Sequence, residues 1–325
     1  MKLLHDLIKI NTYEGNYSEM IKYLVDYLKS KTNCEIHIQN ISHSKANVIA
    51  VYGNPEFLIN CHMDTVKPSD AWTFDPLSLN AKEDKIYGLG ACDTKGNIYM
   101  VIKALEEADP KNLMVLFSID EESGIKTGVK YFLESDFKNN IVRAIVCEPT
   151  ELKYVSKHKG YYSFTLENFS DSAHSSMNSK GAIVKAAHNI IKLDELGFNV
   201  GIIEGGTAGN VVSQRCTYRA SIRTFEKLSH VVDTIKQNCK ETKIQNRFDG
   251  PPLINNDPLF DGDFHEVGFW TEASLFQEAG INTIVFGAGS IKQAHSEDEY
   301  VEKWQLEKGI EKIKGLLHEH KQFMK

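Results

Sequence analysis

Short, mostly apolar runs alternate with amphipathic stretches along much of this chain, and this alternation limits its fold more than any other feature. The apolar runs are candidates for strands buried on both faces, at residues 57–61, 113–117, 141–146 and 283–286. Apolar residues recur at helical spacing in the stretches near 16–31, 95–108, 270–279 and 302–322. Buried strands that alternate with helices predict an α/β domain with a mostly parallel sheet.

The pattern changes near residue 155. Strands are expected at 161–169, 199–204, 211–224 and 242–248, with helices at 179–196 and 226–240. The resulting order, β-α-β-β-α-β, is that of a ferredoxin-like unit. The α/β pattern resumes after Gly250-Pro251-Pro252. The sequence therefore predicts a catalytic domain of residues 1–155 and 255–325, interrupted by an inserted α+β domain of residues 156–254.

The composition of the chain indicates which kinds of binding partner and which cellular compartment are expected. The 325 residues carry a net charge of −7, which argues against a nucleic-acid surface. No apolar run approaches the ~18 residues of a membrane span, and residues 1–10 are too charged for a signal peptide. The six cysteines form no C-x-x-C pair. We therefore expect no membrane partner and a reducing, cytoplasmic location.

Histidines and carboxylates recur where the predicted strands end. They are His62, Asp64, Asp93, Glu121, Glu122, Glu148 and His295. Ligands of open α/β sheets collect at the carboxyl ends of the strands, so these side chains are expected to share one site. Each also has an ordinary explanation, such as a helix N-cap for Asp93 or a solvated acidic turn for Asp120–Glu122. Their coincidence at one edge favours a metal site.

The residue types indicate which metal. Two histidines with several carboxylates suit zinc. Five ligands exceed the needs of one tetrahedral ion and suit two ions about 3.5–4 Å apart that share a carboxylate. Such a site lowers the pKa of bound water to about 7, and one free acid must then move the proton. Cys61, Cys92 and Cys147 directly precede candidate ligands, and either thiolate ligation or a role as small buried hydrophobes remains open.

Other chemistries lack their motifs. Gly88-x-Gly90 is without the third glycine of a dinucleotide loop, because Asp93 occupies that position. No G-x-S-x-G element is present, so Ser175 and Ser176 beside His174 are weak candidates for a nucleophile.

Across nearly its whole length the chain resembles the M20 family of metal-dependent aminoacylases and carboxypeptidases. The matching stretches are His62-Met63-Asp64-Thr65-Val66, Gly88-Leu89-Gly90-x-x-Asp93-x-Lys95-Gly96, Asp120-Glu121-Glu122, Glu148-Pro149-Thr150, Ala173-His174-Ser175-Ser176 and His295–Tyr300. The resemblance implies a zinc-exopeptidase-like catalytic domain interrupted by a lid that often forms a homodimer.

The resemblance also implies a role for each residue. Asp93 would bridge two zinc ions, for which cobalt can substitute. His62 and Glu148 would complete one ion site, and Glu122 and His295 the other. Glu121 would be the general base, and Asp64 would orient His62. His174, on the lid, would stabilise an oxyanion, from its own chain or across a dimer.

Within the family, Thr271-Glu272-Ala273 and Gly287–His295 are similar to the branch that deacetylates N-acetyl-L-ornithine in arginine biosynthesis. The implied substrate is a small N-acyl amino acid, bound in part by Asn210, Arg223 and Glu272. A surface ion pair for Arg223 and an exposed first-turn position for Glu272 are the ordinary alternatives. Another hydrolase of the family, such as a succinyl-diaminopimelate desuccinylase, an aminoacylase or a peptidase, and a non-catalytic binder remain as alternative functions.

Overall fold

The computed structural model describes residues 1–124, 127–177, 180–260 and 262–323. The chain forms two units, described separately below. The first comprises Met1–Ser156, Asn255–Glu266 and the chain from Thr271 onward, and the second comprises Lys157–Ile254 and Val267–Trp270. Residues 267–270 therefore group with the inserted segment, although the sequence pattern assigned them to the flanking domain.

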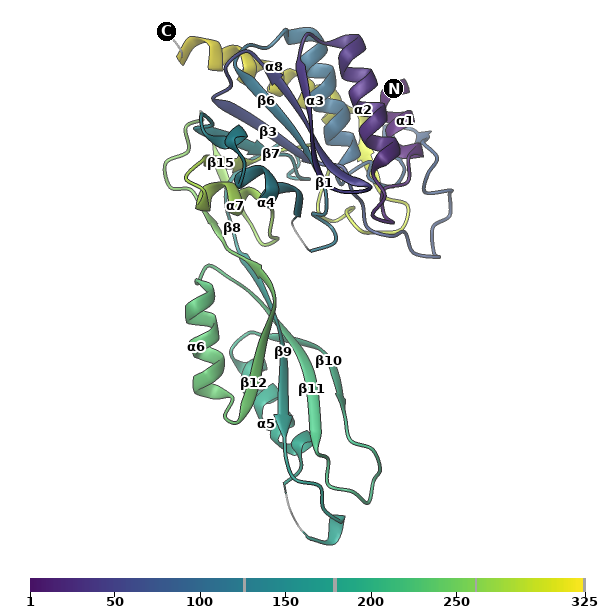
Figure 1. The fold of residues 1–325 in the computed structure, drawn as a ribbon. Coiled ribbons are helices and arrows are strands. Elements are labelled where there is room, and N and C mark those ends of the chain that lie inside the picture. The colour runs from purple at the N-terminus through teal and green to yellow at the C-terminus, as the bar shows by residue number, and fades with distance from the viewer. Residues whose placement is uncertain (125–126, 178–179, 261, 324–325) are drawn as a thin grey trace. The chain divides into compact units, whose positions relative to one another are not determined.

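The first unit contains most of the regular elements (Figure 1). Its helices are α1 (Lys2–Lys9), α2 (Ser18–Lys31), α3 (Lys95–Ala108), α4 (Thr127–Leu133), α7 (Ala273–Glu278) and α8 (Lys303–Phe323), with the 3-10 turn η1 (Asp136–Lys138). Its strands are β1 (Glu35–Ser42), β2 (Lys45–Tyr52), β3 (Phe57–His62), β4 (Asn80–Lys82), β5 (Lys85–Tyr87), β6 (Leu113–Ser118), β7 (Arg143–Val146), β15 (Asn282–Val285) and β16 (Tyr300–Glu302).

A large sheet has the strand order β1-β2-β6-β3-β7-β15-β8-β13. Here β8 is Tyr154–His158 and β13 is Leu253–Ile254. A further strand, β14 (Phe264–Val267), pairs with β8. The central strands β6, β3, β7 and β15 are parallel, and the strands at both edges are antiparallel. The predicted α/β class is confirmed, and its parallel part is the centre of the sheet. Parallel pairing aligns the carboxyl ends of the four central strands, for example His62 opposite Ser118.

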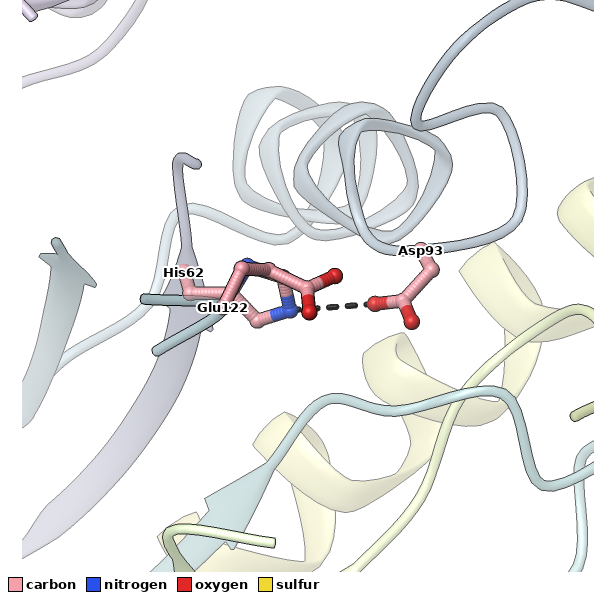
Figure 2. Close-up of side chains that lie close together, drawn as sticks. All are labelled: His62, Asp93 and Glu122. Carbon is pink, nitrogen blue, oxygen red and sulfur yellow. Dashed lines mark hydrogen bonds and ion pairs between the residues drawn. The ribbon is translucent and has the colours of Figure 1, made fainter. Parts of the chain in front are cut away.

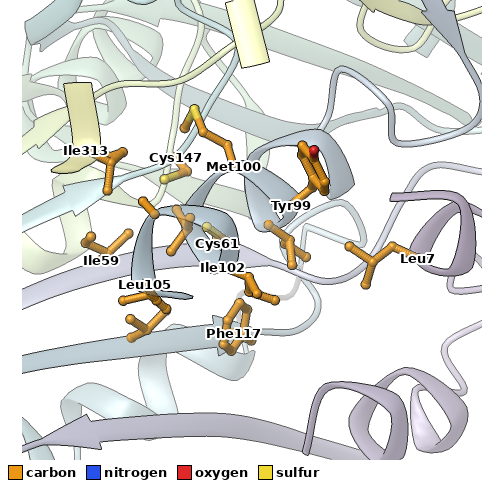
Figure 3. Packing of buried hydrophobic residues seen from close by; sticks show 14 of the residues in the cluster. Leu7, Ile59, Cys61, Tyr99, Met100, Ile102, Leu105, Phe117, Cys147 and Ile313 are labelled. Carbon is orange, nitrogen blue, oxygen red and sulfur yellow. The ribbon is translucent and has the colours of Figure 1, made fainter. Parts of the chain in front are cut away.

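Helices cover both faces of this sheet. On one face α1, α3 and α8 pack together, and α2 packs beside them against β2, whereas α4 and α7 lie on the other face (Figure 1). All residues of β3 and β6 are buried, which explains why most of them are apolar. Ile59 and Cys61 of β3 meet Ile102 and Leu105 of α3 in the main core (Figure 3).

The second unit is an antiparallel sheet with two helices. Its strands are β9 (Gly160–Phe169), β10 (Asn199–Gly205), β11 (Arg215–Thr224) and β12 (Thr242–Gly250), in the order β10-β11-β9-β12. Its helices are α5 (Ala182–Glu195) and α6 (Leu228–Asn238), with the 3-10 turn η2 (Ser175–Met177). This is the predicted ferredoxin-like arrangement, with its own core around Phe164, Leu166 and Tyr218.

In the part of the chain that the structure describes, no helix is both long and apolar enough to span a bilayer.

Candidate metal centre

The carboxyl ends of the central strands bring the predicted ligands together. His62 is the last residue of β3, Glu122 follows β6 by four residues, and Glu148 follows β7 by two. Asp93 stands two residues before α3, and His295 lies in the segment between β15 and β16. The sheet therefore assembles side chains that are up to 233 residues apart in sequence, as from His62 to His295.

Asp93 lies between the two histidines. Its Oδ1 is 3.0 Å from His62 Nε2, the contact drawn in Figure 2, and its Oδ2 is 3.5 Å from His295 Nε2. One carboxylate thus offers a different oxygen to each imidazole. This is the geometry required of a carboxylate that bridges two cations.

A second carboxylate accompanies each histidine. Glu148 Oε1 is 3.9 Å from His62 Nε2, and Glu122 Oε1 is 2.8 Å from His295 Nε2. Glu122 also approaches the other histidine, since one ligand atom each of His62, Asp93 and Glu122 lie within 4.8 Å of one another (Figure 2). The donor atoms of the five residues are of types that suit divalent cations, and those of His62, Asp93 and Glu122 are close enough together to hold one ion.

The charge of the cluster also suits cations. Burial, reinforced by the charge of Asp93, raises the pKa of Glu148 well above its usual range and raises that of Glu122. Burial acts in the same direction on Asp93, but the hydrogen bond with His62 and the charges of His62 and His295 together outweigh it and lower the pKa of Asp93. Three carboxylates held this close together repel one another, and positive charge between them would relieve that repulsion.

Glu121 is half-buried beside this cluster. Burial raises its pKa well above the usual range, and the charge of Glu122 adds to the effect. The preceding residue, Asp120, has a left-handed backbone (φ 63°) and is buried. Its carboxylate accepts hydrogen bonds from Tyr17 Oη at 2.9 Å and Lys45 Nζ at 2.7 Å. The roles of Tyr17 and Lys45 could not be predicted from the sequence, because both residues lie about 75–100 positions from the turn that they hold.

Asp64 contacts His62 differently from the sequence-based expectation. His62 Nδ1 lies 2.9 Å from the backbone oxygen of Asp64, whereas the nearer carboxylate oxygen is 3.6 Å away. The carboxylate instead accepts the backbone N–H groups of Glu121 and Glu122, at 3.3 and 2.9 Å. Asp64 therefore touches both the histidine and the turn that carries the two glutamates.

The cysteines beside the ligands are buried thiols. Cys61 and Cys147 belong to the hydrophobic core (Figure 3), and Cys92 Sγ donates to the backbone oxygen of Ser290 at 3.3 Å. Burial raises the thiol pKa of Cys61 and of Cys92 well above the usual range. These environments favour neutral packing residues over thiolate ligands.

The predicted residues of the lid lie in the second unit. His174 is exposed and forms an isolated antiparallel bridge with Val211, while its Nδ1 is 2.8 Å from Ser176 Oγ. Asn210 is exposed, and its backbone oxygen accepts from the backbone N–H of Ser175. The guanidinium of Arg223 stacks on Tyr161, 4.6 Å from the ring centroid. Their roles toward a substrate stay predictions.

Glu272 does not fit the expected contact with a substrate ammonium. Its side chain is fully buried, and Oε2 accepts from Asn60 Nδ2 at 3.4 Å and Ser118 Oγ at 3.3 Å. Burial raises its pKa to about 8, so its carboxyl group is mostly protonated at neutral pH. The expected exposed position is wrong as well, because the Glu272 side chain is buried against Asn60 of β3 and Ser118 of β6.

Comparison with known proteins shows which family the chain belongs to. The sequence profile of "Peptidase family M20/M25/M40" matches residues 58–241, more than half of the chain. The chain belongs to this family. It is an M20 hydrolase in which the matched segment contains four of the five proposed ligands, the exception being His295.

Two deacetylases are similar to this M20 chain over most of its length. An acetylornithine deacetylase of Pectobacterium carotovorum is 30% identical, covering 85% of this chain and 83% of the relative. An N-acetyl-L-citrulline deacetylase of Xanthomonas campestris is 27% identical, covering 91% and 90%. Among solved structures, a dinuclear metal-binding M20 peptidase of Bacillus subtilis is 16% identical with a TM-score of 0.74, covering 97% and 95%, which supports the fold.

Proposed function

We propose that this M20 hydrolase removes the acetyl group from N-acetyl-L-ornithine with the aid of two zinc ions, for which cobalt can substitute. The observation that carries the proposal is the position of Asp93, whose two oxygens face His62 and His295. In this assignment His62 and Glu148 would hold one ion, His295 and Glu122 would hold the other, and Asp93 would be shared by both. When bound, the ions supply the positive charge that acidifies a water molecule and polarises the amide carbonyl.

Glu121 is assigned the proton transfers. It is half-buried next to Glu122, and its raised pKa means that its carboxylate accepts a proton more readily than usual. The same carboxyl group then delivers that proton to the departing amine. Asp64 supports this role by holding the backbone of residues 121 and 122.

The acyl group is inferred from the relatives and from the charges near α7. The two relatives above are named as deacetylases of acetylornithine and acetylcitrulline. A succinyl substrate would add a carboxylate, and residues 267–290 contain no Arg or Lys to meet it. A peptidase is the second candidate, because a tripeptidase of Staphylococcus aureus has the same fold with a TM-score of 0.80 at 16% identity.

The second unit is proposed as a lid that supplies His174, Asn210 and Arg223 to the substrate. Arg223 is exposed on β11 and suits a substrate carboxylate. His174 would donate a hydrogen bond to the oxyanion formed during hydrolysis.

The same unit is proposed to form a homodimer. Strand β10 is at the edge of its sheet and is exposed along most of its length, with Ile202 at 44% and Ile203 at 53% exposure. An exposed apolar edge strand favours pairing with another strand. Helix α5 adds the exposed side chains Ile183, Val184 and Ile191.

A cytoplasmic role in arginine biosynthesis follows from this substrate. All six cysteines are free. This includes Cys61, near the end of β3, and Cys147, which directly follows the neighbouring strand β7. Free thiols throughout a chain are typical of a reducing compartment.

A hydrolysis screen tests the proposal. Zinc-loaded protein would be assayed with N-acetyl-L-ornithine, N-acetyl-L-citrulline, N-succinyl-diaminopimelate and a dipeptide. We expect the highest kcat/KM for N-acetyl-L-ornithine. Preference for the dipeptide would favour the peptidase, and preference for the succinyl compound would overturn the charge argument. Binding of less than one zinc per chain, without hydrolysis, would favour a non-catalytic binder.

A further inference from the structure

Glu299 is a buried carboxylate outside the proposed ligand set. It is 2% exposed and stands directly before β16, four residues after His295. Its Oε1 accepts the backbone N–H groups of Cys92 at 2.8 Å and Asp93 at 2.9 Å, and its Oε2 accepts that of Gly90 at 2.9 Å. One side chain thus binds three backbone donors of the loop that presents Asp93.

The backbone around Glu299 is joined to the same loop. Its carbonyl oxygen accepts the N–H of Gly88 at 3.0 Å, and the next residue, Tyr300, pairs with Tyr87 of β5. Gly90 adopts φ 81°, and a Cβ there would lie 2.9 Å from carbons of the Lys95 side chain. The loop is therefore tightly confined between Glu299 on one side and the start of α3 on the other.

We propose that Glu299 is a positioning residue that holds the bridging carboxylate of Asp93 between the two histidines. The inference rests on the proposed two-metal function. Because one of the three donors is the N–H of Asp93 itself, Glu299 fixes the backbone from which that carboxylate projects. A site of this kind must keep its ligands within about 0.5 Å of the working geometry.

The arrangement requires an acceptor at both side-chain oxygens of Glu299, because three backbone N–H donors converge on them. A glutamine at 299 would turn its own NH₂ group toward at least one of these donors. A buried donor left facing another donor loses its hydrogen bond and its solvation, which weakens the hold on the loop.

Glu299→Gln tests the inference, and Asp298→Asn is its matched control. Asp298 is the adjacent residue and also accepts a backbone N–H, but from Thr73 at 2.9 Å, away from the Asp93 loop. Metal-free wild type and both variants would be titrated calorimetrically with Zn²⁺, and the spectrum of the Co²⁺ forms recorded. We expect about 10- to 100-fold weaker binding and an altered Co²⁺ spectrum in Glu299→Gln. Asp298→Asn should match the wild type.

The outcomes separate this inference from the proposed function. If the wild type itself fails to bind two ions, the two-metal function is wrong. If the wild type binds two ions and Glu299→Gln binds them equally tightly with the same Co²⁺ spectrum, only the role of Glu299 is overturned. Thermal unfolding with chelator present checks that the variants are folded. Should Glu299→Gln not fold, Glu299→Asp, whose shorter side chain retracts the carboxylate, replaces it under the same criteria.

Discussion

Two adjacent glutamates at the centre of the site meet different partners. Glu122 Oε1 contacts His295 Nε2 at 2.8 Å, a distance at which both can serve one cation. Glu121 is assigned no cation, and burial with the neighbouring charge of Glu122 raises its pKa. A carboxylate that binds a proton more readily than usual is suited to carry it between water and a leaving amine.

Glu121→Ala is therefore expected to retain both metal ions and lose turnover. General acid–base groups contribute roughly 10²–10⁴-fold to rate, so kcat should fall by about this factor. The measurement is kcat with N-acetyl-L-ornithine, together with metal content by mass spectrometry of the purified variant. The control is Glu134→Ala, an exposed glutamate of the same unit, which should change neither quantity. Near-wild-type turnover by metal-replete Glu121→Ala would refute the proton-transfer role.

At the scale of elements, the turn after β6 is held from three sides. Asp64 accepts the N–H groups of Glu121 and Glu122, while Tyr17 and Lys45 bind Asp120. The turn carries both a proposed metal ligand and the proposed base. Loosening it should therefore affect metal binding and catalysis together.

Asp64→Asn is expected to weaken metal binding and to lower kcat, each by about 10- to 100-fold, because an amide places a donor where one N–H of the turn needs an acceptor. Both effects in one variant would distinguish it from Glu121→Ala, which keeps its metal. Zinc titration and steady-state kinetics measure them. The control is Asp75→Asn, in an exposed loop where Asp75 accepts the N–H of Leu77. A variant with unchanged zinc affinity would show that Asp64 does not hold the turn as proposed.

The strands that present the ligands could be predicted well from the sequence. The contacts that hold the ligands in place could not. The apolar runs of β3 and β6 and the helical spacing of α3 are local signals, and they located these elements to within one or two residues. Parallel pairing of β3 with β6 and β7 then placed His62, Glu122 and Glu148 at one edge of the sheet. The carboxylate contacts of Asp64 with Glu121 and Glu122 span 57 and 58 residues and leave no local pattern.

Helix α4 shows a second reason why the sequence did not predict every element of the fold. It has seven described residues, with Gly128 in its first turn, and only Val129 and Phe132 show helical apolar spacing. Its stability comes from tertiary packing, including the ring contact of Phe132 with Phe276 of α7. The burial of Glu272 has the same origin, because Asn60 and Ser118 meet it from distant strands.

At the scale of the whole molecule, the proposed chemistry draws on both units. The metal ligands and Glu121 belong to the first unit, whereas His174 belongs to the second. A complete site therefore needs a lid, from the same chain or from a partner in the proposed homodimer.

Mixing two inactive variants distinguishes these sources of His174. If the lid of one subunit serves the other, a mixed dimer of His174→Ala and Glu121→Ala has one site with both native groups. Up to about a quarter of wild-type activity should return, because half of the dimers are mixed and each has one complete site of two. Subunit exchange would be verified with differently tagged chains. No recovery after verified exchange would exclude action across the dimer.

The two histidines of the centre differ in their access to solvent. The side chain of His62 is 2% exposed, whereas that of His295 is 52% exposed. An ion held on the His295 side would exchange with its surroundings faster than its neighbour. A chelator should then remove the proposed zinc pair in two kinetic phases, leaving for a time a form with one ion beside His62 and Glu148. Stopped-flow release would reveal the two phases, and His295→Ala should abolish the faster one.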